Sequence, residues 1–240
     1  MTTVREKQEL ISQYHDQGYV VVRSCFSLEE VADWQRECDQ LWALPENRDT
    51  NEFRVDLRDT TEGIRIPERL DPVTDASPVF SKLSRDERIL SLAMDLLGDE
   101  ARLFKDKLIL KLPGTCGYRT HQDYAYVADF GFEGDRQLAV AIAIDSSDAE
   151  NGAIEVFPGR HTEQLPAPAD DDYLVDEASL DLSTGKLINM DPGDILIFHS
   201  LCPHRSSPNR TEESRRILYF TYTAASCGDF YEIYYRLGKP

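Results

Sequence analysis

Three residues of types that bind metal ions stand out: His121 and Asp123, separated by one residue, and His204 far downstream. On an extended strand, residues two apart point to the same side, so the His121 imidazole and the Asp123 carboxylate can converge on one ion. Two neutral imidazoles and one carboxylate on one face of an octahedron leave three positions open, as in non-haem Fe(II) oxygenases. A His-x-Asp triplet alone is a weak signal in a chain with 5 histidines and 44 acidic residues, because chance often produces one.

Four sequence blocks, which together span Leu103 to Tyr222, strengthen this reading. They are Lys111-Leu-Pro-Gly followed by His121-Gln-Asp123, Glu150-Asn-Gly-Ala-Ile-Glu-Val-Phe-Pro-Gly-Arg-His161, Pro192-Gly-Asp-Ile-Leu-Ile-Phe-His199, and His204 through Arg215. In content and order they resemble the phytanoyl-CoA dioxygenase family of Fe(II)- and 2-oxoglutarate-dependent oxygenases. The part before Leu103 matches this family only in general character.

The resemblance implies a metal site made of His121, Asp123 and His204 and a hydroxylation that uses Fe(II), 2-oxoglutarate as co-substrate and O2. Succinate and CO2 would be released, and ascorbate would support turnover. Hydroxylation is expected rather than halogenation, because related halogenases have a small residue at the place of Asp123. The implied fold is a double-stranded β-helix, the cupin-like jelly roll.

The co-substrate would be bound by residues on either side of the last block. A guanidinium matches a carboxylate bidentately, as the distal carboxylate of 2-oxoglutarate requires. Family spacing selects Arg215 over Arg216 for this role, and Arg216 is then expected at the surface. Ser206 could donate its hydroxyl to the same carboxylate or simply form a turn. Lys111 matches a position that approaches the co-substrate or the substrate in some relatives.

The remaining candidate ligands are expected to be structural. His161 ends a Pro-Gly-Arg-His turn and His199 ends an apolar strand, so a hydrogen-bonded histidine is the better reading for both. The five cysteines show no paired spacing, which disfavours a disulfide framework or a zinc site. Cys202 lies two residues before His204, yet packing is again preferred to ligation.

Length and composition predict one unit, residues 1–240, with a helical part (1–100) followed by a jelly-roll core (101–240). The net charge of −18 argues against nucleic acid and anionic membranes as partners. No apolar run approaches a membrane span and no signal segment precedes the first helix, so a cytoplasmic protein is expected.

Helical signals occupy the first hundred residues. Apolar spacing predicts a helix over residues 3–17 that ends at Gly18, and a short strand over residues 19–22. Ser27 and Glu30 form a capping box for a second helix that ends before Pro45. A further helical pattern begins at Ser77-Pro78 and runs to Gly98. Residues 45–76 show no periodicity, which is typical of a functional or disordered segment.

Short β runs separated by turns follow from residue 102 on. They cover residues 103–112, 138–145, 154–157, 186–190, 195–199 and 217–223, a pattern typical of a sandwich or barrel. The family often has a tryptophan in the second of these strands. This chain has Ala141 there, which predicts a roomier wall.

A small acidic molecule is the expected substrate, such as an organophosphonate or an amino or carboxylic acid. Four arginines fall within residues 54–69 of a strongly acidic chain, and Arg58 and Arg65 are the candidates to bind its anionic group. Pairing with Asp56, Asp59, Glu62 and Glu68 is the alternative for each arginine. Lys107 and Tyr124 are further candidates, whereas Lys105 is expected at a solvated edge. Residues 105–111 and 117–121 also resemble relatives that hydroxylate amino-phosphonates.

Two rival functions remain open. A cupin-like protein could bind a metal or a small acid without catalysis, and a missing ligand or arginine would favour it. An isomerase or hydrolase that uses another metal is the third possibility, but it would leave Arg215 without a role. Formation of succinate from 2-oxoglutarate distinguishes the first hypothesis from both.

Overall fold

The computed structural model describes residues 4–43, 49–50 and 53–236. Its helices are α1 (Val4–Gln17), α2 (Leu28–Trp42), α3 (Val73–Ala76), α4 (Pro78–Leu83), α5 (Glu87–Leu97) and α6 (Tyr231–Arg236). Its strands are β1 (Tyr19–Val22), β2 (Asp49–Thr50), β3 (Phe53–Asp59), β4 (Arg65–Asp71), β5 (Ala101–Lys111), β6 (Tyr118–His121), β7 (Gln137–Ala143), β8 (Ile154–Val156), β9 (Lys186–Ile188), β10 (Ile195–His199), β11 (His204–Ser206) and β12 (Arg215–Ala224).

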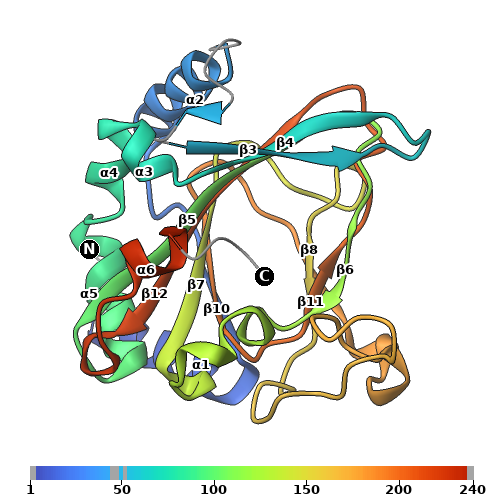
Figure 1. The fold of residues 1–240 in the computed structure, drawn as a ribbon. Helices are drawn as coiled ribbons and strands as arrows, with labels where there is room; N and C mark the ends of the chain where they lie inside the picture. Colours follow the sequence, from blue (N-terminus) through green and yellow to red (C-terminus); the bar gives the residue numbers. More distant parts are fainter. Residues whose placement is uncertain (1–3, 44–48, 51–52, 237–240) are drawn as a thin grey trace.

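Two antiparallel sheets form the body of the molecule (Figure 1). The larger has the order β1-β10-β7-β12-β5-β4-β3-β2 and the smaller the order β6-β11-β8-β9. Helices α1, α2, α4 and α5 cover the outer face of the larger sheet, whose side chains form one apolar cluster with theirs. This is the mainly β architecture with flanking helices that the sequence predicts.

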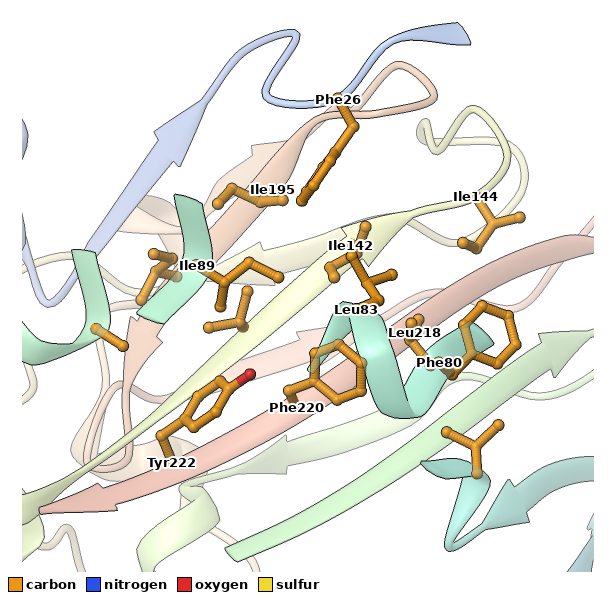
Figure 2. Packing of buried hydrophobic residues seen from close by; sticks show 14 of the residues in the cluster. Phe26, Phe80, Leu83, Ile89, Ile142, Ile144, Ile195, Leu218, Phe220 and Tyr222 are labelled. Carbon is orange, nitrogen blue, oxygen red and sulfur yellow. The ribbon is translucent and has the colours of Figure 1, made fainter. Parts of the chain in front are cut away.

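Strand β7 shows how the pattern of side chains separates the two faces. Leu138, Val140 and Ile142 point to the helices, whereas the alanines between them face the smaller sheet. Figure 2 shows the helical side, where Phe80 and Leu83 of α4 lie over β12. Each fully buried side chain of this kind contributes about 1.5–3 kcal/mol, so the outer layer fixes the sheet whose inner face carries the polar residues.

The local signals near the N-terminus are confirmed. Helix α1 ends at Gly18, whose positive φ of 79° accompanies a hydrogen bond from its amide to the Tyr14 carbonyl. The capping box of α2 is complete, with Ser27 accepting from the Glu30 amide and Glu30 accepting from the Ser27 amide. The single helical pattern predicted after Ser77 is instead two helices, because Asp86 caps a new one.

Residues 45–76 are not irregular over most of their described part. Strands β3 and β4 form a hairpin that extends the larger sheet through pairs of β4 with β5. Residues 53–58 alternate between apolar and charged side chains, a strand signal that was missed, and the charged residues Asp56 and Arg58 line the cavity. Residues 44–48 and 51–52 lie outside the described part of the chain. Within that part, no helix is both long and apolar enough to cross a membrane.

Candidate active site

His121, Asp123 and His204 come together between the two sheets. One donor atom from each lies within 4.8 Å of the other two, and the two imidazole rings are 4.2 Å apart at their centroids. The register of the smaller sheet pairs His204 of β11 directly with His121 at the end of β6. Neither β6 nor β11 was predicted as a strand, because neither segment contains a run of apolar residues.

Hydrogen bonds orient both imidazoles in the same way. Nδ1 of His121 lies 2.8 Å from the Arg119 carbonyl oxygen, and Nδ1 of His204 lies 3.0 Å from that of Cys202. A donated Nδ1–H leaves the Nε2 lone pair of each ring available to a metal ion. Burial, with the neighbouring His204, lowers the pKa of His121 to about 3, and burial also lowers the pKa of His204. Both rings are therefore in the neutral, ligating form at pH 7.

Asp123 is a buried carboxylate that cations keep charged. Burial acts to raise its pKa, but Lys105 and Lys107 outweigh this effect and hold the pKa below its usual range. The Lys105 ammonium lies 3.9 Å from Oδ1 of Asp123. Two neutral imidazoles and one carboxylate with space around them fit a ferrous ion.

The extended-strand argument for His121 and Asp123 holds in part. Strand β6 ends at His121, Gln122 is still extended, and Asp123 begins a short 3-10 helix, Asp123–Tyr126. Gln122 points the other way and is 1% exposed. Its amide donates to the carbonyls of Leu201 (2.6 Å) and Glu163 (2.9 Å), which ties the metal-site turn to two loops.

A cavity of about 510 Å³ adjoins these three residues. It is lined by Asp56, Arg58, Arg69, Asp71, Lys105, Asp106, Lys107, Ile109, Tyr118, Arg119, His121, Asp123, Tyr126, Ile154, Asp171, Leu174, Phe198, His204, Arg205, Ser206, Arg215, Tyr219, Tyr234 and Tyr235. Strands β5 and β12 form the floor of the cavity, and each pair of opposite residues on the cavity side of these strands makes one row. The register places Lys111 opposite Arg215 and Lys107 opposite Tyr219. The floor is therefore cationic at both of these rows.

Arg215 is the buried arginine of the pair at the start of β12. It is 2% exposed, and its Nε and Nη1 atoms have no hydrogen-bond partner among the described residues, while the Tyr219 hydroxyl contacts the guanidinium. Two unpartnered donors of a buried guanidinium fit a ligand carboxylate. Arg216 points to the other face, where it forms ion pairs with Asp145 (2.7 Å) and Asp39 (2.6 Å). It is anchored there rather than free at the surface.

Lys111 and Ser206 lie beside Arg215. The Lys111 ammonium donates to the Ser206 hydroxyl (2.8 Å) and to the Ser207 carbonyl (2.7 Å), and burial together with Arg215 lowers its pKa to about 7. Gly152, in the Glu-Asn-Gly block, has a φ of 82°, and a Cβ there would meet the Ser207 carbonyl at 2.3 Å. The block thus closes the cavity behind these two residues.

The lysines of β5 face the cavity and not solvent. The expectation of a solvated edge is wrong for Lys105, which is 7% exposed, because its side chain lines the cavity between Asp123 and the Tyr234 ring. Lys107 lines the cavity with its ammonium 5.0 Å from the centre of the Tyr219 ring. Burial lowers the pKa of Lys107 to about 8.

The arginines of the β3–β4 hairpin differ in whether their side chains reach the cavity. Arg58 lines the cavity and donates to the Gly117 carbonyl, with its guanidinium 4.2 Å from the Tyr118 ring centre. Arg65 does not reach the cavity: its exposed side chain pairs with Asp59 at 3.4 Å near the hairpin turn. The prediction of Arg65 as a substrate-binding residue is therefore wrong.

Arg69, which was not singled out as a site residue, does line the cavity. It pairs with Asp56 and, at 3.2 Å, with Asp71, so the alternative of local pairing holds for this arginine. The side chain of Arg54 lies outside the described part of the structure.

Tyr124 was predicted to contact substrate, and the structure contradicts this. Its hydroxyl donates to the Phe132 carbonyl at 2.9 Å, and Tyr124 is not among the residues that line the cavity. The 3-10 turn after Gln122 presents Tyr126 instead, whose ring lies 5.9 Å from that of His121. Tyr234 and Tyr235 of α6 also line the cavity and were missed, since no motif marks them.

The histidines expected to be structural are so. His199 accepts a hydrogen bond from the Leu201 amide at 3.0 Å, and Nε2 of His161 lies 3.1 Å from the His15 carbonyl oxygen. Cys202 is completely buried and burial raises its pKa to about 12, which agrees with packing.

Ala141 does not give the cavity a roomier wall. It is fully buried and pairs across the sheet with Tyr219, and it is Tyr219 that lines the cavity. A small residue on one strand is thus accompanied by a large ring on the next.

Comparison with known proteins agrees with this geometry. The chain is 30% identical over 237 residues to methylphosphonate hydroxylase of Gimesia maris, which covers 98% of this chain and 86% of that protein. It is 27% identical to 2-aminoethylphosphonate dioxygenase of an uncultured bacterium, over 92% of this chain and 83% of the relative.

Solved structures show the same fold. EctD from S. alaskensis, with 2-oxoglutarate and 5-hydroxyectoine, superposes with a TM-score of 0.76 at 24% identity and covers 93% of this chain and 77% of that one. The epimerase SnoN, with Fe3+ and α-ketoglutarate, gives 0.77 at 22% identity over 93% of this chain and 85% of that one. The cupin-like jelly roll is thereby confirmed.

The sequence profile of the family described as phytanoyl-CoA dioxygenase (PhyH) matches residues 14–217. The match begins well before Leu103, so the helical layer and the β3–β4 hairpin share the family pattern that the sequence blocks revealed only farther on. This chain belongs to the phytanoyl-CoA dioxygenase family.

Proposed function

We propose that this protein is a Fe(II)- and 2-oxoglutarate-dependent dioxygenase that hydroxylates a small metabolite with an anionic group, an organophosphonate or an amino or carboxylic acid. The reaction class follows from the family. The substrate class rests on one observation above all, the Lys107 ammonium inside the cavity.

Lys107 is a cation that the protein leaves available. Within the described part of the chain, neither a hydrogen bond nor an ion pair engages its ammonium, and its contact is the Tyr219 ring. By contrast, Lys111 is used by Ser206 and Ser207. Lys107 is half-buried, so an anion that fills the cavity and displaces water from this ammonium would itself supply the missing acceptor. A phosphonate or carboxylate of the substrate meets that requirement.

The cavity volume and the similar proteins also support a small anionic substrate. A cavity of about 510 Å³ must hold the co-substrate as well as the substrate, which leaves room for a small molecule and not for an acyl-CoA. Two of the similar proteins are named for phosphonates.

In this mechanism His121, Asp123 and His204 would hold the iron. When bound, the ferrous ion supplies the oxidative chemistry, which couples O2 and the decarboxylation of 2-oxoglutarate to succinate and CO2 with insertion of oxygen into substrate. Arg215 would bind the distal carboxylate of the co-substrate, with Lys111 and Ser206 beside it. These residues leave the cavity between Lys107 and the metal ligands to the substrate.

The positions of the paired residues support a separate site for an anion at each end of the cavity. Lys111 and Arg215 lie two rows from Lys107 and Tyr219 along the paired strands β5 and β12. Two anions can therefore be held at once, each near its own cation, with the metal ligands across from both. Such orientation is a large part of what a protein contributes to catalysis.

The test is turnover with purified protein, Fe(II), ascorbate, 2-oxoglutarate and each candidate in turn, methylphosphonate and 2-aminoethylphosphonate first. We expect succinate together with a product heavier by one oxygen atom. Lys107→Met should raise the KM for the phosphonate roughly 10- to 100-fold, as expected for a lost charged hydrogen bond. Lys186→Met, which alters an exposed lysine, is the control. No succinate with any acidic candidate would contradict the proposal and favour a non-catalytic binding protein.

Three finer points belong to the same proposal. Ascorbate is proposed as a supporting reductant and the cytoplasm as the location. Residues 1–240 are proposed to act as one catalytic unit, since strands from both halves of the sequence line the cavity.

A further inference from the structure

Strand β5 is no longer paired with β4 beside Lys107 and Lys105, two lysines that line the cavity. Strand β4 pairs with β5 at Ile109 and Leu108 and ends at Asp71. The next position along β4 is Pro72, which has no amide hydrogen to donate. Asp106, one step farther along β5 from Lys107, is thus left without a strand partner on that side.

The Tyr235 hydroxyl makes the hydrogen bonds to Asp106 that a neighbouring strand would otherwise make. The Tyr235 hydroxyl accepts a hydrogen bond from the Asp106 amide (2.9 Å) and donates one to the Asp106 carbonyl (2.8 Å). The Tyr231 hydroxyl, one turn earlier on α6, donates to the Asp106 carboxylate at 2.8 Å. The same carboxylate accepts from the amides of Val73 and Thr74 at the start of α3. One residue therefore holds both α3 and α6 at the edge of β5.

Helix α6 reaches the cavity because of this attachment. It lies against β5 (Figure 1), and its Tyr234 and Tyr235 are part of the cavity lining. Tyr234 is 6% exposed, packs on Phe104 at 5.2 Å between ring centroids, and has its ring centre 5.9 Å from the Lys105 ammonium.

We propose that α6 is the wall that limits the size of the substrate, with Tyr234 and Tyr235 as specificity-determining residues and Asp106 as the residue that positions them. This inference rests on the proposed function, since it names the residues that bound the space available to that small anion. It explains how the cavity is closed beside Lys105, where β4 no longer covers β5.

The first experiment asks whether α6 covers the lysines, and it needs no substrate. The protein with Fe(II) and 2-oxoglutarate, kept anaerobic, is treated with acetic anhydride, and acetylation of Lys105 is measured by mass spectrometry relative to the exposed Lys186. In the double variant Tyr231→Phe/Tyr235→Phe we expect Lys105 to react roughly 5- to 30-fold faster, because the hydrogen bonds by which both hydroxyls hold α6 are lost. Tyr222→Phe is the matched control, since its hydroxyl bonds the Ser84 carbonyl on the other face of the sheet.

The second experiment asks whether α6 selects by size. Binding of methylphosphonate, 2-aminoethylphosphonate and phenylphosphonate is followed through the absorption band of the anaerobic Fe(II)–2-oxoglutarate protein. The unaltered protein should bind the two small anions and exclude phenylphosphonate, and Tyr234→Ala should admit it.

The outcomes separate this inference from the proposed function. If the unaltered protein binds no phosphonate but labelling of Lys105 rises in the double variant as expected, the proposed substrate class is wrong, while the role of α6 as the cavity wall is supported. If phosphonates bind but both labelling and size selection are unchanged in folded variants, the wall is refuted. Should the double variant fail to fold, a chain that ends at Phe230 and Tyr234→Ala decide the question by the same two readouts.

Discussion

Replacing Arg215 with alanine tests the part of the site that the structure defines most sharply. The guanidinium is 2% exposed and has two donors without a protein acceptor, so a ligand carboxylate is the partner that its burial requires. Truncating one member of a buried, hydrogen-bonded charge pair costs about 2–5 kcal/mol. Lys111, directly opposite on β5, stays in place, so the lower part of that range applies.

A cost of about 2–3 kcal/mol corresponds to a roughly 30- to 150-fold rise in the Kd for 2-oxoglutarate. Arg215→Lys should fall between the two, because it keeps the charge but loses the bidentate geometry. The assay is an anaerobic titration of the Fe(II) protein with 2-oxoglutarate, followed by absorbance, which needs no substrate and no turnover.

Arg216→Ala is the matched control on the neighbouring residue. Its ion pairs with Asp145 and Asp39 lie on the opposite face, so the Kd should change little while the melting temperature falls. A rise of less than about threefold for Arg215→Ala, or equal effects of the two variants on Kd, would refute the assignment of the carboxylate to Arg215.

Three further predictions concern the metal ligands and their surroundings. Alanine at His121, Asp123 or His204 should abolish turnover and weaken iron binding, whereas His199→Ala should keep its iron; equal losses of iron at His199 and His204 by metal analysis would show the wrong ligand choice. Burial lowers the pKa of His199 to about 4, so its neutral form stabilises the fold above pH 6.5 and that contribution is lost as the pH falls towards 4. Between pH 6.5 and 5 the free energy of unfolding should therefore drop by about 2 kcal/mol more in the unaltered protein than in His199→Gln, measured by urea denaturation; parallel curves would contradict this. The product made in chloride buffer should be hydroxylated and free of chlorine by mass spectrometry, because Asp123 occupies the ligand position; a chlorinated product would overturn that reading.

The sequence predicts local structure and ligands best where a residue type has a specific structural or chemical role. Gly18 and the Ser27–Glu30 box mark helix ends, and both are where the structure has them. The apolar run of residues 138–145 predicts a strand, and β7 covers most of it. The grouping of His121, Asp123 and His204 followed from ligand chemistry together with the family resemblance, and the structure brings the three residues together.

Strands whose inward residues are charged were harder to predict. The β3–β4 hairpin was not predicted as two strands, and Lys105 was expected at a solvated edge, because hydrophobic periodicity assumes that the inside is apolar. Here the inside is a ligand cavity, so Lys105 and Arg69 are inward residues with acidic neighbours. Arg65 was placed wrongly for a different reason: simple alternation along β4 puts it on the same face as Arg69, but a register shift in the pairing with β3 breaks that alternation.

Contacts made by single side chains across long sequence distances lay beyond any periodic signal. The edge of β5 at Asp106 is completed by a phenol from residue 235, and the pattern of a six-residue terminal helix cannot reveal which backbone group its tyrosines reach. Yet the need for such a contact follows from the chain itself, since β4 ends before Pro72 and leaves a buried amide and carbonyl to be satisfied. A helix that satisfies that edge lies beside the cavity, and this is why Tyr234 and Tyr235 are in a position to limit the size of the substrate, as we propose.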